Sequence, residues 1–237
     1  MNPVVRSAIG AALITGSVAA FAAVGFSVAS REKAEQEDPT EVRADDAAHS
    51  VLIVLDVTDP LPPNQTQGLE EWIWGQENSE LAGGDVVSVW ALGHLPQGEL
   101  VPIFRKRFPG RTADGWTHDP KMVATRCDSL FSRPLLEAVR RAASSRCASR
   151  TQLREAIQEL SELGAFAGSR VRLVLVSDLG ESAPSRPIAR VDLTGISAEV
   201  LEVARPRSTF EERTRRRALW RDYFERSGAS VRFTRLP

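Results

Sequence analysis

The sequence has few of the residues from which disulfide scaffolds and zinc sites are built. Its 237 residues include two cysteines and three histidines. Two cysteines cannot form a network of disulfides, and the three histidines are scattered along the chain rather than placed at the short spacings that mark zinc sites. An excess of charge is also lacking, because 30 basic residues face 31 acidic ones and the formal net charge is −1. This balance argues against a dedicated nucleic-acid-binding protein and against a disordered acidic protein.

Several motifs that mark enzymes are absent as well. The chain has no Gly-x-Ser-x-Gly elbow of serine hydrolases, no phosphate-binding P-loop and no Gly-x-Gly-x-x-Gly dinucleotide fingerprint. The histidines, His49, His94 and His118, are scattered near predicted loops or strand ends. We interpret them as surface residues rather than as general bases. The sequence alone therefore favours a function other than catalysis.

A long uncharged segment stands near the amino terminus, from Ser7 to Ala29. As a helix it would be about 34 Å long at about 1.5 Å per residue, enough to cross a hydrocarbon core of roughly 30 Å. We therefore predict that residues 1–29 contain a single transmembrane anchor, with residues 7–29 in the bilayer. The short tail with Arg6 is easily left in the cytosol. The protein is thus expected in the inner (cytoplasmic) membrane, with its carboxyl-terminal domain outside the cytoplasm.

Two other interpretations of this segment stay open. A cleaved signal peptide is compatible with the small residues at 27–29, although its apolar run usually has only about 7–15 residues. A buried helix of a soluble fold is the third interpretation, but no polar residues mark a solvent-facing side. The following residues 30–49 are polar and acidic, and we interpret them as a linker. The folded domain is expected to span residues 50–237.

From residue 50 onward, short apolar runs alternate with longer amphipathic stretches. Continuous apolar runs are typical of strands that are buried on both faces of a parallel sheet. This alternation predicts an α/β fold, a Rossmann-like three-layer sandwich with a mostly parallel central sheet. The predicted strands are 51–57, 86–92, 100–104 (an edge hairpin partner), 171–178, 198–204 and 230–236. The predicted helices are 64–81, 120–143 (kinked at Pro134), 152–163 and 208–227.

Two acids, Asp56 and Asp178, stand at the carboxyl ends of strongly apolar predicted strands. In open α/β sheets, ligands bind outside the carboxyl ends of the strands. These two acids are therefore the first candidates for site residues.

The residues around these acids resemble the von Willebrand factor A-type (vWA) family. In that family the first strand ends in an Asp-x-Ser-x-Ser motif, the metal-ion-dependent adhesion site. Asp56 matches the acid and Thr58 the first hydroxyl, whereas Pro60 stands in place of the second serine. Thr151 in TQLREAI is similar to the family's threonine before a helix, and Asp178 in LVLVSDLGES to its last acid.

Further segments are similar to a set of bacterial membrane-anchored vWA-like proteins. They are DVTDPL, FPGR, LVSDLGES and the Asp-Pro-Lys helix start at 119–121. The resemblance extends from about residue 50 to the end and rests on the order and spacing of its motifs. It implies a vWA-like fold and a module that binds another protein.

The resemblance also implies a divalent metal site, with Mg²⁺ as the expected ion. Asp56, Thr58, Thr151 and Asp178 would supply two carboxylates and two hydroxyls, and a partner's carboxylate or waters would complete the shell. Pro60 has no side-chain oxygen and would remove one ligand. An alternative stays open, in which the Asp-Thr-Asp-Pro turn only fixes the chain and caps the next helix.

A strand that ends in an acid also begins the haloacid-dehalogenase-like phosphotransferases, in which the acid attacks phosphorus. Asp56 would be the nucleophile and Ser177 the phosphate-binding serine. That family has a second acid two positions after the first, where this chain has Thr58. It also needs a downstream lysine, but Lys106 and Lys121 both precede Ser177. We keep phosphoryl transfer or phosphatase activity as the alternative function.

Two further features have competing interpretations. Cys127 and Cys147 are expected to be free thiols, with a disulfide as the alternative if the domain faces outward. The last predicted helix is rich in arginine, which indicates either a basic patch for an acidic partner or a solvated face with pairs such as Glu212–Arg216. We favour the solvated face.

Overall fold

A computed structural model describes residues 38, 40–42, 49–92, 100, 102–111, 119–145, 152–167, 170–181, 189–205 and 208–236. One compact unit runs from Thr40 to Pro237. The anchor predicted at residues 7–29 and most of the predicted linker lie outside the described residues. Among the helices that are described, none is long and apolar enough to span a bilayer.

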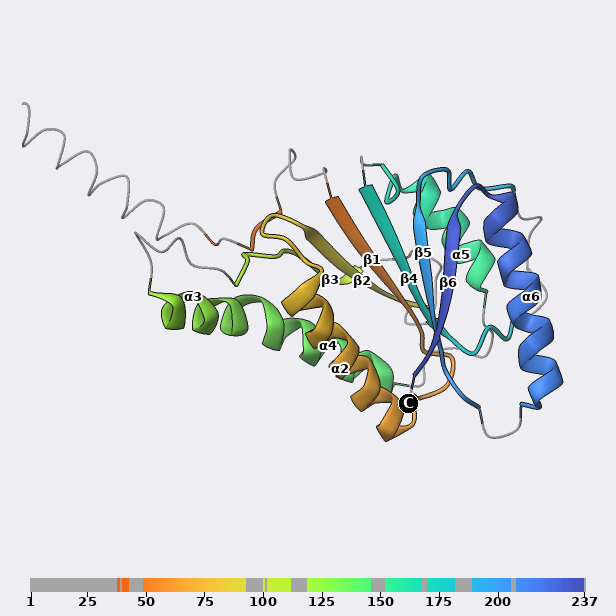
Figure 1. Cartoon of the computed structure of the whole chain (residues 1–237), viewed down its shortest axis with the longest axis horizontal. Helices are drawn as coiled ribbons and strands as arrows, with labels where there is room; N and C mark the ends of the chain where they lie inside the picture. The colour runs from red at the N-terminus through yellow and green to blue at the C-terminus, as the bar shows by residue number, and fades with distance from the viewer. Residues whose placement is uncertain are drawn as a thin grey trace, which may run out of the picture. The chain divides into compact units, whose positions relative to one another are not determined.

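Six strands form one sheet at the centre of the compact unit (Figure 1). Their order across the sheet is β3-β2-β1-β4-β5-β6, and all neighbours are parallel except β3, which runs antiparallel to β2 at one edge. The prediction of a mostly parallel sheet with an antiparallel edge strand is confirmed. The strands are β1 (His49–Asp56), β2 (Val86–Leu92), β3 (Pro102–Arg107), β4 (Arg170–Ser177), β5 (Ser197–Glu202) and β6 (Ser230–Arg235).

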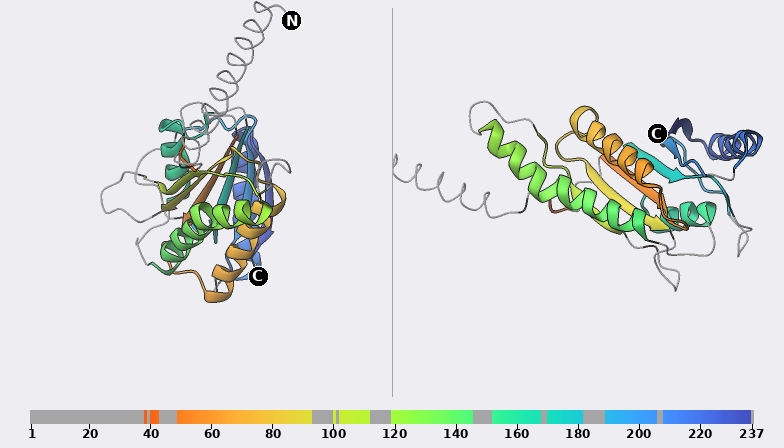
Figure 2. Two further views of the ribbon diagram at one scale, coloured as in Figure 1. Left: turned by 90° about the vertical axis from the view of Figure 1, so that its left-hand side faces the viewer. Right: turned by 90° about the horizontal axis from the view of Figure 1, so that it is seen from below.

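Helices cover both faces of the sheet, which gives the three layers of a Rossmann-like α/β sandwich (Figures 1 and 2). One face carries α2 (Pro63–Ser79), α3 (Pro120–Cys127) and α4 (Arg133–Ser144). The other face carries α5 (Leu153–Glu162) and α6 (Phe210–Arg226). The predicted α/β class is therefore confirmed, and each face of the sheet has its own hydrophobic cluster.

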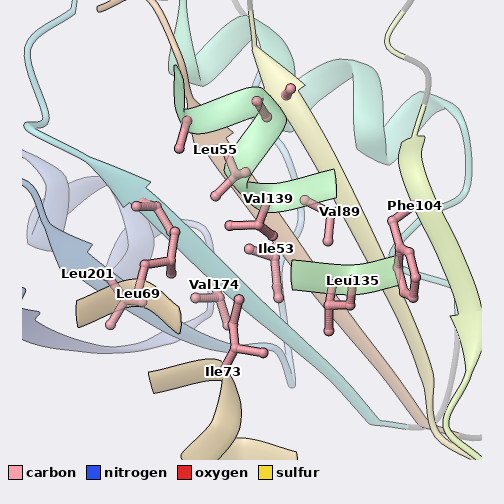
Figure 3. Packing of buried hydrophobic residues seen from close by; sticks show 14 of the residues in the cluster. Ile53, Leu55, Leu69, Ile73, Val89, Phe104, Leu135, Val139, Val174 and Leu201 are labelled. Carbon is pink, nitrogen blue, oxygen red and sulfur yellow. The ribbon is translucent and has the colours of Figure 1, made fainter. Parts of the chain in front are cut away.

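The central strand β1 shows why its sequence is a continuous apolar run. Side chains alternate between the two faces of a strand. Ile53 and Leu55 pack in the cluster that includes Leu69 of α2 (Figure 3). Leu52 and Val54 pack in the opposite cluster, beneath α5 and α6. Both faces of β1 are thus buried against helices, as the apolar run predicts.

The helical stretch predicted at 120–143 is interrupted near its proline. A π-helical turn (Asp128–Ser132) separates α3 from α4. Pro134 has no N–H to donate to the carbonyl of Leu130, four residues earlier. That carbonyl instead accepts a hydrogen bond from Lys106 Nζ of β3 at 2.9 Å. The irregularity predicted at Pro134 therefore takes the form of a π turn, and a neighbouring strand supplies the missing donor.

Cys127 and Thr40 are both buried in the compact unit. Cys127 is 1% exposed and is a free cysteine, as predicted, whereas Cys147 lies outside the described residues. Thr40, which belongs to the predicted linker, is also 1% exposed. Its carbonyl accepts a hydrogen bond from the Arg107 amide at 2.9 Å, so the compact unit includes a segment before residue 50.

Candidate functional site

The candidate site lies where the direction of chain progression across the sheet reverses. The chain passes from β1 outward to β2 and β3, then returns to β4 on the other side of β1. Such a switch point is where doubly wound sheets place their ligand sites, at the carboxyl ends of the strands. Asp56 ends β1 and Asp178 directly follows β4. Because Leu55 pairs with Val176 in register, Asp56 comes to lie beside Ser177.

The carboxylate of Asp56 is buried and both its oxygens accept hydrogen bonds. Asp56 is 2% exposed. Its Oδ1 accepts from the Thr58 hydroxyl at 2.7 Å and from the Thr58 amide at 3.2 Å. Its Oδ2 accepts from the Ser177 hydroxyl at 2.7 Å. The side chain thus fixes the turn after β1 and joins it to β4.

Burial sets the protonation behaviour of this acid. Removal from water raises the pKa of Asp56, and the nearby charge of Asp178 raises it further. The hydrogen bonds from Thr58 and Ser177 act in the opposite direction, since they stabilise the ionised form. The net result is a pKa above its ordinary value.

Asp178, by contrast, faces two arginines. Arg216 of α6 places Nη1 3.3 Å from Asp178 Oδ2, and Nε of Arg205 lies 3.7 Å from the same oxygen. Arg205 also reaches the loop after β1, where its Nη1 lies 3.4 Å from the carbonyl oxygen of Pro60 and 3.9 Å from Asp59 Oδ2. A guanidinium group therefore bridges the loop after β1 and the acid after β4.

The turn after β4 is held in an unusual backbone conformation. Leu179 has φ = 59°, the one positive φ among the described non-glycine residues. Its amide donates to the Ser177 hydroxyl at 2.9 Å, and its carbonyl accepts from Trp220 Nε1 at 3.3 Å. Gly180 follows, where an added Cβ would lie only 3.0 Å from Asp178 Oδ1. The turn is thus tied on both sides, and it directs Asp178 toward the arginines.

The described ligand candidates do not fit a magnesium ion. The oxygens of Asp56 are occupied by hydroxyl and amide donors, and the Asp178 carboxylate faces two permanently charged guanidinium groups that would repel a cation. In the described part of the chain, no three His, Cys, Asp or Glu side chains gather as a ligand set. Thr151 lies outside the described residues.

The alternative turn interpretation fits the described residues in part. The Asp56 carboxylate does fix the turn through Thr58. It does not cap α2, because the N-cap position is Pro62 and no side chain caps that end. The nucleophile required by the phosphotransferase alternative is 2% exposed and has both oxygens engaged.

Arg205 was not among the site residues predicted from the sequence. A signal was available, since Arg205 directly follows the strand predicted at 198–204 and Asp178 ends the strand predicted at 171–178. Arg216 was noted only as part of the charged last helix. There the predicted Glu212–Arg216 pair is present but long, at 4.0 Å, and Arg216 contacts Asp178 more closely, at 3.3 Å.

The sequence matches no protein-family model and no curated protein.

Proposed function

We propose that this protein is a membrane-anchored, vWA-like protein-interaction module that uses arginine in place of a metal ion. The observation that carries the proposal is the position of the Arg205 guanidinium between the loop after β1 and Asp178. In the family that the sequence resembles, the metal joins these same two elements. Pro60, the residue that departs from the family motif, is the one whose carbonyl faces Arg205.

The arginines retain capacity for a partner. A guanidinium group has five N–H donors that match a carboxylate in geometry. Toward the described residues, Arg205 and Arg216 each donate hydrogen bonds only from Nη1. Their side chains are 17% and 29% exposed, respectively. A carboxylate on a partner protein can therefore bind to Arg205 and Arg216, which we call the arginine rim. In the family that the sequence resembles, a partner's acid binds the metal in the corresponding way.

The anchor belongs to the same proposal. An uncharged segment at 7–29 would hold the protein in the cytoplasmic membrane, with the domain on the outer side. Extraction of membranes with alkaline carbonate tests it: the full chain should stay in the pellet, and a chain without residues 1–29 should be released. Release of both chains would contradict the anchor.

A comparison of co-purifying proteins tests whether Arg205 and Arg216 bind a partner. The full chain and three variants, Arg205→Gln, Arg216→Gln and Arg141→Gln, are isolated from detergent-solubilised membranes and their partners identified by mass spectrometry. Arg141 is the matched control, since it is 71% exposed on α4 and pairs with Glu137. A partner lost with Arg205→Gln or Arg216→Gln and kept with Arg141→Gln supports the rim. An identical set in all four samples refutes it.

Two further measurements separate this proposal from its alternatives. Titration of Mg²⁺ into the full chain is expected to give no heat of binding at millimolar metal, and measurable heat would restore the metal hypothesis. Phosphatase activity is expected to be absent. Activity that disappears in Asp56→Asn would instead assign the protein to the phosphotransferases.

A further inference from the structure

A groove of about 770 Å³ lies on the α6 side of the sheet, next to the turn after β4. Its walls come from α6, from the amino-terminal end of α5, and from Gly180, Glu181, Ala189 and Arg190. This volume falls within the range of about 300–1,000 Å³ that is typical of small-molecule sites. The site described above lies at its end, since Arg216 also lines the groove.

The floor of the groove is apolar and partly aromatic. It is made by Leu179, Leu219, Trp220 and Tyr223. Trp220 and Tyr223 pack edge to face with their ring centroids 5.3 Å apart, which holds both rings in place. Leu219 is 61% exposed although it is a large apolar side chain in a helix. This combination provides a firm surface for a flat apolar group.

The rim of the groove is basic. Four arginines and two acids line it, and one of the four, Arg216, pairs with Asp178 at 3.3 Å. Arg226 pairs with Asp222 at 2.8 Å, and Arg154 pairs with Glu181. Arg190 differs, because in the described part of the chain its one hydrogen bond runs to the carbonyl of Arg226 and no carboxylate forms an ion pair with it. Arg190 is thus the rim cation with the most capacity for an anion.

Tyr223 contributes a polar group that the fold leaves unused. Its hydroxyl oxygen is buried and has no hydrogen-bond partner among the described residues. Leaving a buried hydroxyl without a partner is unfavourable, and native structures usually satisfy such groups. Because Tyr223 lines the groove, this unsatisfied donor lies next to the arginines of the rim.

We propose that this groove binds a small anionic ligand with a flat apolar body. The body lies on Leu219 and Tyr223, behind which the buried Trp220 packs. The anionic group accepts hydrogen bonds from Arg190 and from the Tyr223 hydroxyl. The inference does not depend on the proposed function, since neither Arg190 nor Tyr223 belongs to the rim formed by Arg205 and Arg216.

Calorimetry with a defined probe tests this site. Naphthalene-1,5-disulfonate is titrated into the full chain in detergent, with the matched detergent buffer as blank and uncharged 1,5-dihydroxynaphthalene as the comparison ligand. A ligand of this size is expected to bind with a dissociation constant on the order of 0.1 mM. Arg190→Gln should weaken binding about tenfold, and Tyr223→Phe, which keeps the ring, about threefold or more. The control Arg141→Gln, on the opposite face of the sheet, should leave binding within about twofold of the parent.

Four results would overturn the proposal. They are no saturable heat at millimolar disulfonate, equally tight binding of the uncharged comparison ligand, equal weakening by Arg141→Gln, and unchanged binding in both Arg190→Gln and Tyr223→Phe. Thermal unfolding of each variant shows whether it is folded. Tyr223→Phe retains the aromatic packing and so remains informative even where a charge change lowers stability.

Discussion

The Ser177 hydroxyl joins three parts of the candidate site, and its removal gives the sharpest test of the geometry. It donates to Asp56 Oδ2 at 2.7 Å and accepts from the Leu179 amide at 2.9 Å. Ser177 is 1% exposed, so water cannot readily replace the lost oxygen. In Ser177→Ala, a buried carboxylate loses a donor and a buried amide loses its acceptor. Hydrogen bonds to charged groups contribute about 1.5–3 kcal/mol, and a second unsatisfied group adds about 1 kcal/mol or more. We therefore expect a loss of roughly 2.5–4 kcal/mol in the free energy of unfolding.

The loss should depend on pH in a defined direction. The folded-state pKa of Asp56 is above its value in the unfolded chain, mainly because of burial. The folded state therefore holds this proton more strongly, and that stabilisation is lost as the pH rises through the folded-state pKa. The hydrogen bond from Ser177 lowers the pKa of Asp56, so its removal raises this pKa further. Ser177→Ala should consequently destabilise the protein more at neutral pH than at acidic pH.

Urea unfolding of the full chain in non-ionic detergent, followed by tryptophan fluorescence, measures both effects. Ser79→Ala is the matched control, because the Ser79 hydroxyl donates only to the Gly75 carbonyl on the exposed end of α2. It should change stability by no more than about 0.5 kcal/mol. This role of the Ser177 hydroxyl is refuted if Ser177→Ala destabilises no more than Ser79→Ala, or if its effect is the same at neutral and acidic pH.

Three further predictions concern groups outside this turn. Burial raises the pKa of Tyr223 to about 12, so spectrophotometric titration of the chain's one tyrosine should give a midpoint near that value. The stability that the protonated tyrosine supplies should be lost as the pH rises through this range. A midpoint at the ordinary pKa of tyrosine would contradict the burial of Tyr223. Glu77→Ala should cost about 1.5–3 kcal/mol in urea unfolding, because the partly buried Arg111 loses the Glu77 carboxylate at 2.7 Å but keeps the Asp128 carboxylate at 2.9 Å. A change within error would show that the Glu77–Arg111 pair does not stabilise the fold. In Cys147→Ser, the buried Cys127 should react with a thiol reagent only on unfolding, and rapid reaction of the native protein would show that the site is open.

Most of the fold could be predicted from local features of the sequence. The continuous apolar runs of β1, β2 and β4 require burial on both faces, and that condition leads directly to a parallel sheet between helical layers. The edge strand β3 was predicted near its observed place, at 100–104 against Pro102–Arg107. Its boundaries depend on pairing with β2, which local sequence does not reveal. The π turn before Pro134 is similar, because the donor that satisfies Leu130 comes from Lys106 on another element.

The candidate site also contains residues that could be predicted from the sequence and residues that could not. Asp56 and Asp178 could be found because each follows an apolar run, and strand ends in such sheets lie at the ligand-binding edge. Arg205 and Arg216 could not be assigned to Asp178 from sequence, since they are 27 and 38 positions away from it along the chain. The two arginines meet Asp178 only because β5 lies beside β4 and because α6 packs on the sheet over these strands. The sequence alone thus determined the α/β class and the two strand-end acids, through short-range hydrophobic patterning. The tertiary structure decided the chemistry at those acids, because ion pairs form between side chains that only strand order and helix packing bring within a few ångströms.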